Sequence, residues 1–352
     1  MSSISVNTIT DASGGNTTTI NGYTPTMSNM AGRNKIINGA MVFDQRNAGA
    51  VVTAEAYLVD RWRVWRNQTY DIQQVTDAPA GFSNSLRVTK TNTTQSTYGY
   101  LVQYIEGFNF ADMAFGTANA KIVTLSFWVK SSVTGTFSAG LINSASNRSY
   151  PATYTISAAN TWEYKTITIA GDTSGTWLTT NGIGAGVWFN FGAAGTATAN
   201  TWNSTDATSG VTGNANLGTT NGATFYITGV QLEAGSVATP FEHRQYGQEL
   251  ALCQRYYQTN LPSTSYAGTT TGVRLVVVGA ISMRAAPSVA LINGANAMED
   301  FGVNQRNISS LASSSLSFGT STGGLVDATV SSTTASKVIA LNGNVISLSS
   351  EL

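Results

Sequence analysis

The chain has 352 residues, of which 42% are hydrophobic and 10% are aromatic, so it is long enough to form two or three domains with a sizeable core. Only 10% of the residues are charged, against roughly 25% in an ordinary soluble domain, and 18 basic residues balance 18 acidic ones. This balance excludes a general attraction for nucleic acid or an anionic membrane surface. We therefore expect no nucleic-acid partner and no membrane insertion.

Cys253 is the only cysteine and His243 the only histidine of the chain. A disulfide within one chain and a Cys/His zinc site are therefore impossible. The N-terminus lacks the basic start and apolar run of a secretion signal, and no apolar stretch approaches the roughly 20 residues of a membrane helix. We expect synthesis and folding in a reducing cytosol, followed by transport on a larger particle.

Residues 1–33 are polar and contain one short alternating strand candidate at 4–9. Their apolar area is too small for a core of their own. We interpret them as an anchor segment that becomes ordered only against a partner. A mobile terminus is the alternative.

A succession of segments rich in β-branched and aromatic residues, separated by Gly, Asn and Ser, begins at about residue 34. The expected strands are Leu58–Trp65, Ser85–Lys90, Tyr98–Ile105, Ile122–Lys130, Thr161–Ala170, Gly184–Phe191 and Thr224–Leu232. So many strands without helical periodicity predict an all-β antiparallel sandwich, of which the two-sheet jelly roll is the most common large form. We predict such a jelly-roll domain over residues 34–260.

A helix is expected at residues 242–258, at the end of this domain. Pro240 suits a helix start, Glu242 lies where the helix dipole favours an anion, and Arg255 lies where it favours a cation. Spacings of four, three and four residues then place four side chains in one apolar stripe. These are Tyr246, Leu250, Cys253 and Tyr257. The stripe fits a contact in a homotrimer, and packing onto the chain's own sandwich explains it equally well.

Residues 261–352 begin with a loop rich in Ser, Thr and Gly and then show further strand candidates. These are Val273–Ile281, Ser288–Ile292, Ser336–Leu341 and Val345–Leu348. The size and the pattern predict a smaller C-terminal β domain.

Several fragments occur in an order that is characteristic of one protein family. They read NKIINGAM at 34–41, DQR at 44–46, DRW at 60–62, SFWVK at 126–130, GDTSGTW at 171–177, VQLEAGSVATPFEHR at 230–244, QELALCQRYYQ at 248–258, MRAAPSV at 283–289 and EL at 351–352. Together they resemble the carbohydrate-binding-like jelly-roll module of bacteriophage tail fibres and other virion appendage proteins, with the C-terminal module of phage fibres at the end.

This resemblance implies a virion structural protein, a tail fibre or appendage subunit, that is made in the host cytoplasm and attaches to glycan on the host surface. Residues 1–33 would then dock on other virion proteins. It also implies a homotrimer, and it supplies no catalytic residues. A purely structural decoration or connecting protein without a receptor is the first alternative. The host receptor and the position on the particle, at a tip, a collar or the capsid, do not follow from the sequence.

Aromatic residues that are out of phase with the apolar positions of their strands form a candidate glycan platform. Alternate residues of a strand point to opposite faces of a sheet, so Trp128 lies opposite Leu125, Phe127 and Val129. The same test selects the platform residues Tyr100, Tyr104, Trp128 and Trp188. Flat rings of this kind stack on pyranose faces, although burial beneath a helix or a second subunit explains them as well.

Two further tryptophans, Trp177 and Trp202, lie in connections rich in Gly and Asn. Loops at the end of a sandwich often carry recognition groups, so both are candidates for glycan binding. Packing beneath the loops is the alternative for each.

We expect no enzymatic activity and assign no catalytic residue. His243 and Cys253 are ten positions apart on the predicted helix, about 80° apart around its axis, so they cannot form a Cys/His site within it. A polysaccharide depolymerase needs only two carboxylates, and Asp60, Asp172, Asp206 and Glu233 are available. We expect no cofactor. Jelly rolls can hold a structural calcium, but no loop has the dense Asp spacing that would identify metal ligands.

Overall fold

The computed structural model describes residues 32–92, 94, 98–192, 195–259, 263–267, 272–278, 281–285, 287–291, 298–299, 305–306, 308–312, 323–330, 338–341 and 346–352. The anchor predicted for residues 1–33 therefore lies outside the described residues except for its last two. The chain divides into two compact units. The first comprises Met1–Val42, Gly49–Leu58 and Trp62–His243, and the second comprises Phe43–Ala48, Val59–Arg61 and Arg244–Leu352.

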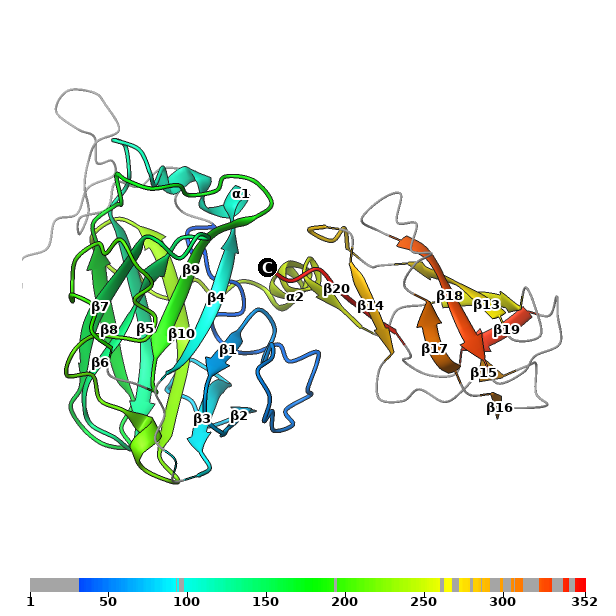
Figure 1. Ribbon diagram of the computed structural model, residues 1–352, viewed down its shortest axis with the longest axis horizontal. Helices are drawn as coiled ribbons and strands as arrows, with labels where there is room; N and C mark the ends of the chain where they lie inside the picture. The colour runs from blue at the N-terminus through cyan, green and yellow to red at the C-terminus, as the bar shows by residue number, and fades with distance from the viewer. Residues whose placement is uncertain are drawn as a thin grey trace, which may run out of the picture. The chain divides into compact units, whose positions relative to one another are not determined.

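The first unit is a sandwich of two five-stranded sheets (Figure 1). One sheet has the order β1-β4-β9-β6-β7, with β1 at Arg63–Arg66, β4 at Gly99–Glu106, β9 at Ile183–Asn190, β6 at Gly135–Ile142 and β7 at Ser149–Ile156. The other has the order β2-β3-β10-β5-β8, with β2 at Tyr70–Val75, β3 at Ser85–Lys90, β10 at Thr224–Ala234, β5 at Val123–Ser131 and β8 at Glu163–Ile169. All neighbouring strands are antiparallel, which confirms the predicted all-β jelly-roll fold.

The core lies between the two sheets. Leu125, Phe127 and Val129 of β5 are fully buried, as their phase in the sequence predicts. The ring of Phe127 meets that of Phe189, from β9 of the facing sheet, at a centroid distance of 4.9 Å. Edge-to-face contacts of this kind add about 0.5–1.5 kcal/mol to the free energy gained by burying the rings.

Three strands of the sandwich were not predicted, because their sequences lack the usual pattern. β2 reads YDIQQV and lies at the edge of its sheet, so polar residues suit it. β6 reads GTFSAGLI and is rich in small residues. β7 contains Pro151, which an edge strand tolerates because one side of its backbone has no ladder to complete. Short helical turns add α1 at Gly107–Phe110, η1 at Ala111–Met113 and η2 at Leu217–Thr219.

The second unit contains the longest helix, α2 at Tyr246–Gln254, and two further sheets. A three-stranded sheet has the order β11-β20-β14, with β11 at Tyr257–Gln258, β20 at Ile346–Ser349 and β14 at Ser288–Leu291. A seven-stranded sheet has the order β16-β15-β19-β12-β13-β18-β17, with β12 at Ser263–Ala267, β13 at Gly272–Val278, β15 at Met298–Glu299, β16 at Gln305–Arg306, β17 at Ile308–Ala312, β18 at Gly323–Val330 and β19 at Val338–Leu341. In the described part of the chain, no helix has the length and apolar character needed to span a membrane.

The helix differs from its prediction in its bounds and in the unit to which it belongs. It begins at Tyr246 rather than at residue 242, because the preceding residues are bonded to β10. It ends at Gln254, and Tyr257 instead pairs with Ser349 in a sheet. The helix also belongs to the second unit, whereas the sequence analysis placed it in the sandwich domain.

A buried ionic cluster joins distant segments of the second unit. Glu351 forms ion pairs with Arg46 and Arg61, and Arg61 is almost fully buried. The two guanidinium groups lie over the rings of Tyr257 and Tyr256, at 3.7 and 3.5 Å from their centroids. The fragments DQR, DRW, QRYYQ and EL, which carry the family resemblance, therefore meet in one cluster.

Candidate functional site

An open pocket with a volume of about 570 Å³ lies on the outer face of the β2-β3-β10-β5-β8 sheet. Strands β5, β8 and β10 supply its base, and the loops at 80–82 and 238–243 supply its walls. Its lining residues are Ala80, Gly81, Phe82, Ser126, Trp128, Tyr164, Gly229, Ala238, Thr239, Pro240, Phe241 and His243. We call this the aromatic pocket.

Two groups of rings form the apolar surface of the aromatic pocket. Trp128 and Tyr164 are direct neighbours on β5 and β8, with ring centroids 5.4 Å apart. Phe82 meets Phe241 at 5.1 Å and His243 at 5.4 Å. Trp128 is half-buried and Tyr164 is 43% exposed, so both present ring surface to solvent.

Gly229 gives the rings room at the base of the pocket. It lies at an irregularity in the pairing of β10 with β5 and has a φ of +61°, in the region that favours glycine. A Cβ atom here would lie 2.7 Å from Cζ of Phe82 and 3.1 Å from Cδ1 of Trp128. A side chain at this position would therefore displace the two rings.

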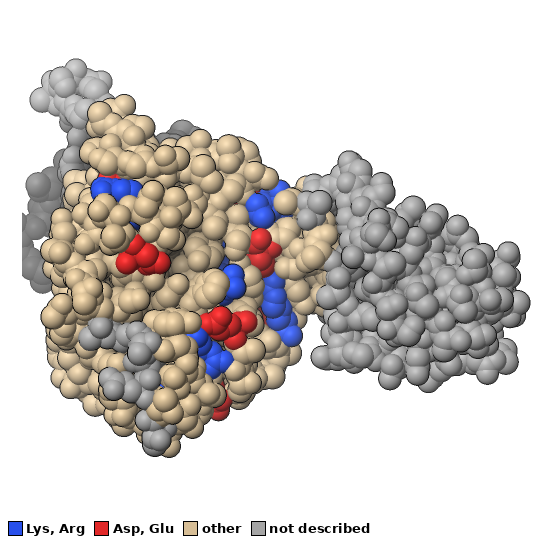
Figure 2. Space-filling view, in the orientation of Figure 1, with Lys and Arg blue, Asp and Glu red and all other residues tan. Residues whose placement is uncertain are grey.

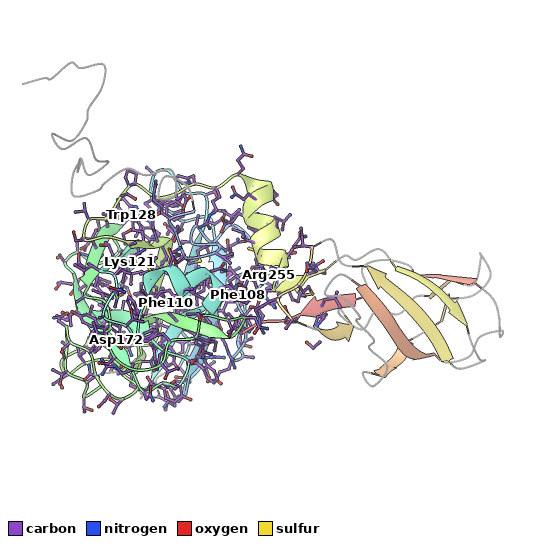
Figure 3. All side chains as sticks on the ribbon, turned by 90° about the horizontal axis from the view of Figure 1, so that it is seen from above. Phe108, Phe110, Lys121, Trp128, Asp172 and Arg255 are labelled. Carbon is purple, nitrogen blue, oxygen red and sulfur yellow. The ribbon has the colours of Figure 1, made fainter. Side chains whose placement is uncertain are left out.

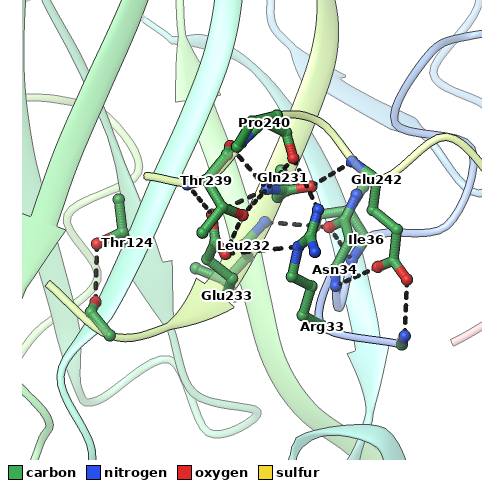
Figure 4. A network of polar contacts seen from close by, with 12 residues as sticks. Arg33, Asn34, Ile36, Thr124, Gln231, Leu232, Glu233, Thr239, Pro240 and Glu242 are labelled. Atoms are coloured by element: carbon green, nitrogen blue, oxygen red, sulfur yellow. Dashed lines mark hydrogen bonds and ion pairs between the residues drawn. The ribbon is translucent and has the colours of Figure 1, made fainter. Parts of the chain in front are cut away.

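A network of buried polar groups fixes the wall formed by residues 238–243 (Figure 4). The Glu233 carboxylate, which is almost fully buried, accepts hydrogen bonds from the backbone N–H of Thr239 at 2.8 Å and from its hydroxyl at 2.6 Å. Gln231 donates to Glu233 at 2.8 Å and accepts from the backbone N–H of Glu242 at 2.8 Å. The segment VQLEAGSVATPFE at 230–242 therefore forms a strand whose polar side chains hold the loop that follows it.

The same network reaches the start of the described chain. Glu242 accepts hydrogen bonds from the backbone N–H groups of Gly32, at 2.6 Å, and Asn34, at 2.8 Å. Arg33 donates to the backbone oxygen of Pro240 at 2.9 Å. The last two residues of the predicted anchor, together with Asn34, are thus bound to the wall of the aromatic pocket.

The aromatic pocket carries almost no charge. None of its lining residues is Asp, Glu, Lys or Arg, and its polar side-chain groups come from Ser126, Thr239, Tyr164, Trp128 and His243. On the face of the molecule in view in Figure 2, charged residues likewise form only a few small groups among the described residues. Recognition in the pocket therefore depends on ring surface and neutral hydrogen-bonding groups.

Of the four predicted platform residues, only Trp128 lines the aromatic pocket. Tyr100, Tyr104 and Trp188 lie on the outer face of the other sheet, so the structure does not bring the four together. Trp188 is fully buried in a cluster with Val102, while Tyr100 and Tyr104 are partly buried against it. Burial raises the pKa of both tyrosines above the ordinary value, and a hydrogen bond from Thr208 to Tyr100 offsets part of the rise at Tyr100.

The connection between β9 and η2 covers part of this second face. Ala197 and Ala207 pack against the cluster around Trp188. Asn190 of β9 donates to the backbone oxygen of Thr208 at 2.9 Å, and Asn214 donates to Ser138 at 3.0 Å. We call this surface the covered face.

The loop tryptophans lie in a third place. Trp177 is buried and Trp202 half-buried, with centroids 5.6 Å apart, and both contact Phe115. Trp177 donates to Asp172 at 3.2 Å. Figure 3 shows Asp172 and Trp128 in separate parts of the sandwich, so these loops do not contribute to the aromatic pocket.

The predicted oligomer contact is not a continuous helical stripe. Tyr246 is 68% exposed and packs on Phe43 at a centroid distance of 4.7 Å, whereas Cys253 is fully buried, which raises the pKa of its thiol. Leu250 is half-buried, and Tyr257 is a buried residue of β11. Packing within the second unit therefore accounts for Cys253 and Tyr257, and homotrimerisation stays a prediction.

The carboxylates considered for a depolymerase are engaged separately. Asp172 forms a bidentate pair with Arg148 at 2.6 and 2.8 Å, and Glu233 belongs to the network described above. Asp206 accepts from Thr208 at 2.7 Å. Asp60 lies in the second unit, where burial raises its pKa to about 6 and a hydrogen bond from Gln45 opposes the rise. No group of three or more His, Cys, Asp or Glu side chains among the described residues could hold a metal ion.

Several pocket residues were not singled out from the sequence. Tyr164 shares its face with the polar Thr166 and Thr168, so the phase test applied to Trp128 would have selected it. Phe241 and His243 lie within the fragment VQLEAGSVATPFEHR, but only the folded loop shows where they point. Phe82 lies in a loop without periodicity, and no pattern in the sequence indicates its role.

Neither family models nor curated proteins match the chain. Solved structures with similarity include tailspike protein 4 of bacteriophage CBA120, at 14% identity and a TM-score of 0.34, covering 57% of this chain and 21% of that one. TmCBM61 in complex with β-1,4-galactotriose has 10% identity and a TM-score of 0.30, covering 57% and 99%. The CBM22-2 xylan-binding domain of Paenibacillus barcinonensis Xyn10C has 14% identity and a TM-score of 0.29, covering 52% and 98%. The match spans about a fifth of the tailspike's length.

Proposed function

We propose that the chain is a subunit of a bacteriophage tail fibre or similar virion appendage that attaches to host-surface glycan through the aromatic pocket. The pocket itself carries the proposal, because it is open, rigidly walled and lined by rings. Its volume of about 570 Å³ lies within the range of about 300–1,000 Å³ that is usual for small-ligand sites.

The chemistry of the lining suits a sugar. The ring faces of Trp128, Tyr164 and Phe82 can stack on the apolar C–H face of a pyranose. The exposed side chains of Tyr164 and His243 can exchange hydrogen bonds with its hydroxyl groups, and the Thr239 hydroxyl, which donates to Glu233, can still accept one. Such a combination of a mainly apolar surface with a few polar groups is typical of ligand sites that fix orientation.

The proposed role is binding without cleavage. A glycosidase needs a pair of carboxyl groups beside the scissile bond, and the lining residues include neither Asp nor Glu. The virion location and the homotrimer rest on the family resemblance of the ordered sequence fragments. A purely structural role without a receptor is the second candidate, and the open pocket favours attachment over it.

Binding to a glycan array that carries bacterial surface polysaccharides tests the proposal. We expect the full chain to bind one class of polysaccharide, and Trp128→Ala and Tyr164→Ala each to lower the affinity at least tenfold with the fold retained in circular dichroism. Phe108→Ala is the matched control, because Phe108 is 63% exposed on α1 and outside the pocket. Absence of binding to any glycan, or equal binding by all variants, would contradict the proposal. A reducing-end assay on the bound polysaccharide distinguishes attachment from cleavage.

A further inference from the structure

A second row of side chains adjoins the aromatic pocket on the same face of the sheet. Lys130 lies two residues beyond Trp128 on β5, so both point outward, and it pairs with Tyr226 of β10. Trp162 lies two residues before Tyr164. The Lys130 ammonium group is 5.2 Å from the ring of Trp162 and 4.2 Å from that of Tyr226. We call Trp162, Lys130 and Tyr226 the second row.

The rings of the second row continue the ring surface of the pocket. Trp162 and Tyr226 are half-buried, and their centroids are 6.1 Å apart. Lys130 is two residues from Trp128 on β5, and Trp162 is two residues from Tyr164 on the segment that enters β8. Two residues of a β-strand span about 6.6 Å at its usual rise. One sugar ring together with its glycosidic linkage spans a comparable length. A glycan chain that places one ring in the pocket can therefore place the next ring on the second row.

Asp77 holds the second row and neutralises it. Its carboxylate pairs with Lys130 and accepts a hydrogen bond from Nε1 of Trp162 at 3.2 Å, which fixes the indole ring. The hydrogen bond from Lys130 is the largest cause of a lowered pKa at Asp77, so the carboxylate is charged at neutral pH. Lys130 is mostly buried, while Asp77 is about half exposed and can still accept a hydrogen bond from a sugar hydroxyl.

We infer that the glycan site extends from the aromatic pocket onto the second row, and that it takes an uncharged glycan chain of at least two sugar rings. The pocket lining has no fixed charge to attract an acidic sugar, and the cation of the second row is already paired with Asp77. The aromatic side chains of the pocket and of the second row favour two successive sugar rings of one glycan chain over a single terminal sugar. This inference rests on the proposed function, because it concerns the same site.

Calorimetric titration of the full chain tests the inference. The probes are the polysaccharide selected on the glycan array and its mono-, di- and trisaccharide fragments. We expect the affinity to rise at least tenfold from the mono- to the disaccharide. Trp162→Ala should abolish this rise while leaving the affinity for the monosaccharide within twofold of that of the wild type. Phe108→Ala again serves as the control, and thermal denaturation checks the fold of both variants.

Each outcome has a distinct meaning. Equal affinity for the mono- and the disaccharide, or a proportional loss at every chain length in Trp162→Ala, would overturn the second row as a subsite. Preference for an acidic polysaccharide, with an affinity that falls as salt is added, would overturn the charge assignment. Absence of binding at every chain length by the wild type would instead contradict the proposed function.

Discussion

Both outer faces of the sandwich carry aromatic residues that alternate with the core residues of their strands, but the two faces differ in what covers these aromatic residues. On the pocket face, Trp128 and Tyr164 remain open to solvent between two loops. On the covered face, Trp188 is fully buried beneath the connection that contains Ala207. An aromatic residue out of phase with the core is thus directed away from the core, but its exposure depends on a loop that the strand pattern does not encode.

Truncation of the corresponding tryptophans gives the sharpest test of this difference. Because Trp188 is fully buried, we expect Trp188→Ala to lower the free energy of unfolding of the sandwich by about 3–5 kcal/mol. Trp128→Ala should cost less, about 1 kcal/mol, since part of its surface is already in contact with water. Denaturant titration followed by intrinsic fluorescence measures both. Equal losses in the two variants would show that the two faces do not differ in burial.

Removal of the carboxylate that holds the pocket wall is expected to have the next largest effect. Glu233→Ala leaves the hydrogen-bonding groups of Thr239 and Gln231 without their partner and should cost about 3 kcal/mol. The affinity for glycan should fall as well, because the wall loses its attachment. Asp112→Ala is the control: its ion pair with Lys35 is 52% exposed on the Asp112 side and should be worth less than about 1 kcal/mol. Unchanged glycan affinity in Glu233→Ala would show that the wall formed by residues 238–243 does not contribute to glycan binding.

Two glycines allow the effect of a side chain at the base of the pocket to be distinguished from the effect of backbone strain, and we expect this effect to be smaller. Gly229→Ala and Gly222→Ala both place a side chain at positive φ, which should cost each variant about 1 kcal/mol. Only at Gly229 does the new Cβ meet Phe82 and Trp128, whereas nothing lies within 4 Å at Gly222. We therefore expect calorimetry to show a loss of glycan affinity in Gly229→Ala alone. A similar loss in both variants would attribute the effect to backbone strain.

The tyrosines of the covered face should make the free energy of unfolding depend on pH at alkaline pH. We expect this effect to be the smallest of the four predicted in this section. Burial raises the pKa of Tyr100 and Tyr104 above the usual value of 10. The native state then holds these protons more tightly than the unfolded state, so their contribution to stability is complete below about pH 10 and is lost as the pH rises further. Alkaline unfolding monitored by tyrosinate absorbance should be shallower in Tyr100→Phe. An unchanged profile would contradict the burial of Tyr100.

The sandwich could be predicted because its strands keep a clear phase. Leu125, Phe127 and Val129 occupy alternate positions of β5, and the core that they form follows from this alternation. β7 could not be recognised in the same way, because it contains Pro151 and several small residues, which are unfavourable in a central strand. The strand forms nevertheless because it lies at the edge of its sheet. The helix prediction was misplaced because Glu242, which looks like an N-terminal helix residue, instead accepts bonds from Gly32 and Asn34.

The site was predicted only in part, for a different physical reason. Phase analysis identified Trp128 as an outward residue, and this residue does line the pocket. The partition of the other aromatic residues between two sheets follows from strand order, and β4 and β9 are neighbours in a sheet that excludes β5. Phe82 and Phe241 come together through loops, and the loop at 238–243 is held by long-range and local hydrogen bonds to the side chains of Gln231 and Glu233. Such contacts leave no period in the sequence.

The ion pair between Arg61 and Glu351 joins residues that are 290 positions apart. During synthesis at about 5–20 residues per second, Arg61 is added to the chain roughly 15–60 s before its carboxylate partner Glu351. The strands of the sandwich can assemble in that interval, whereas the second unit has to wait for translation to pass residue 351. Newly made chains would therefore pass through an intermediate in which the sandwich is folded while the Arg61 side chain, which is buried in the final structure, is still hydrated.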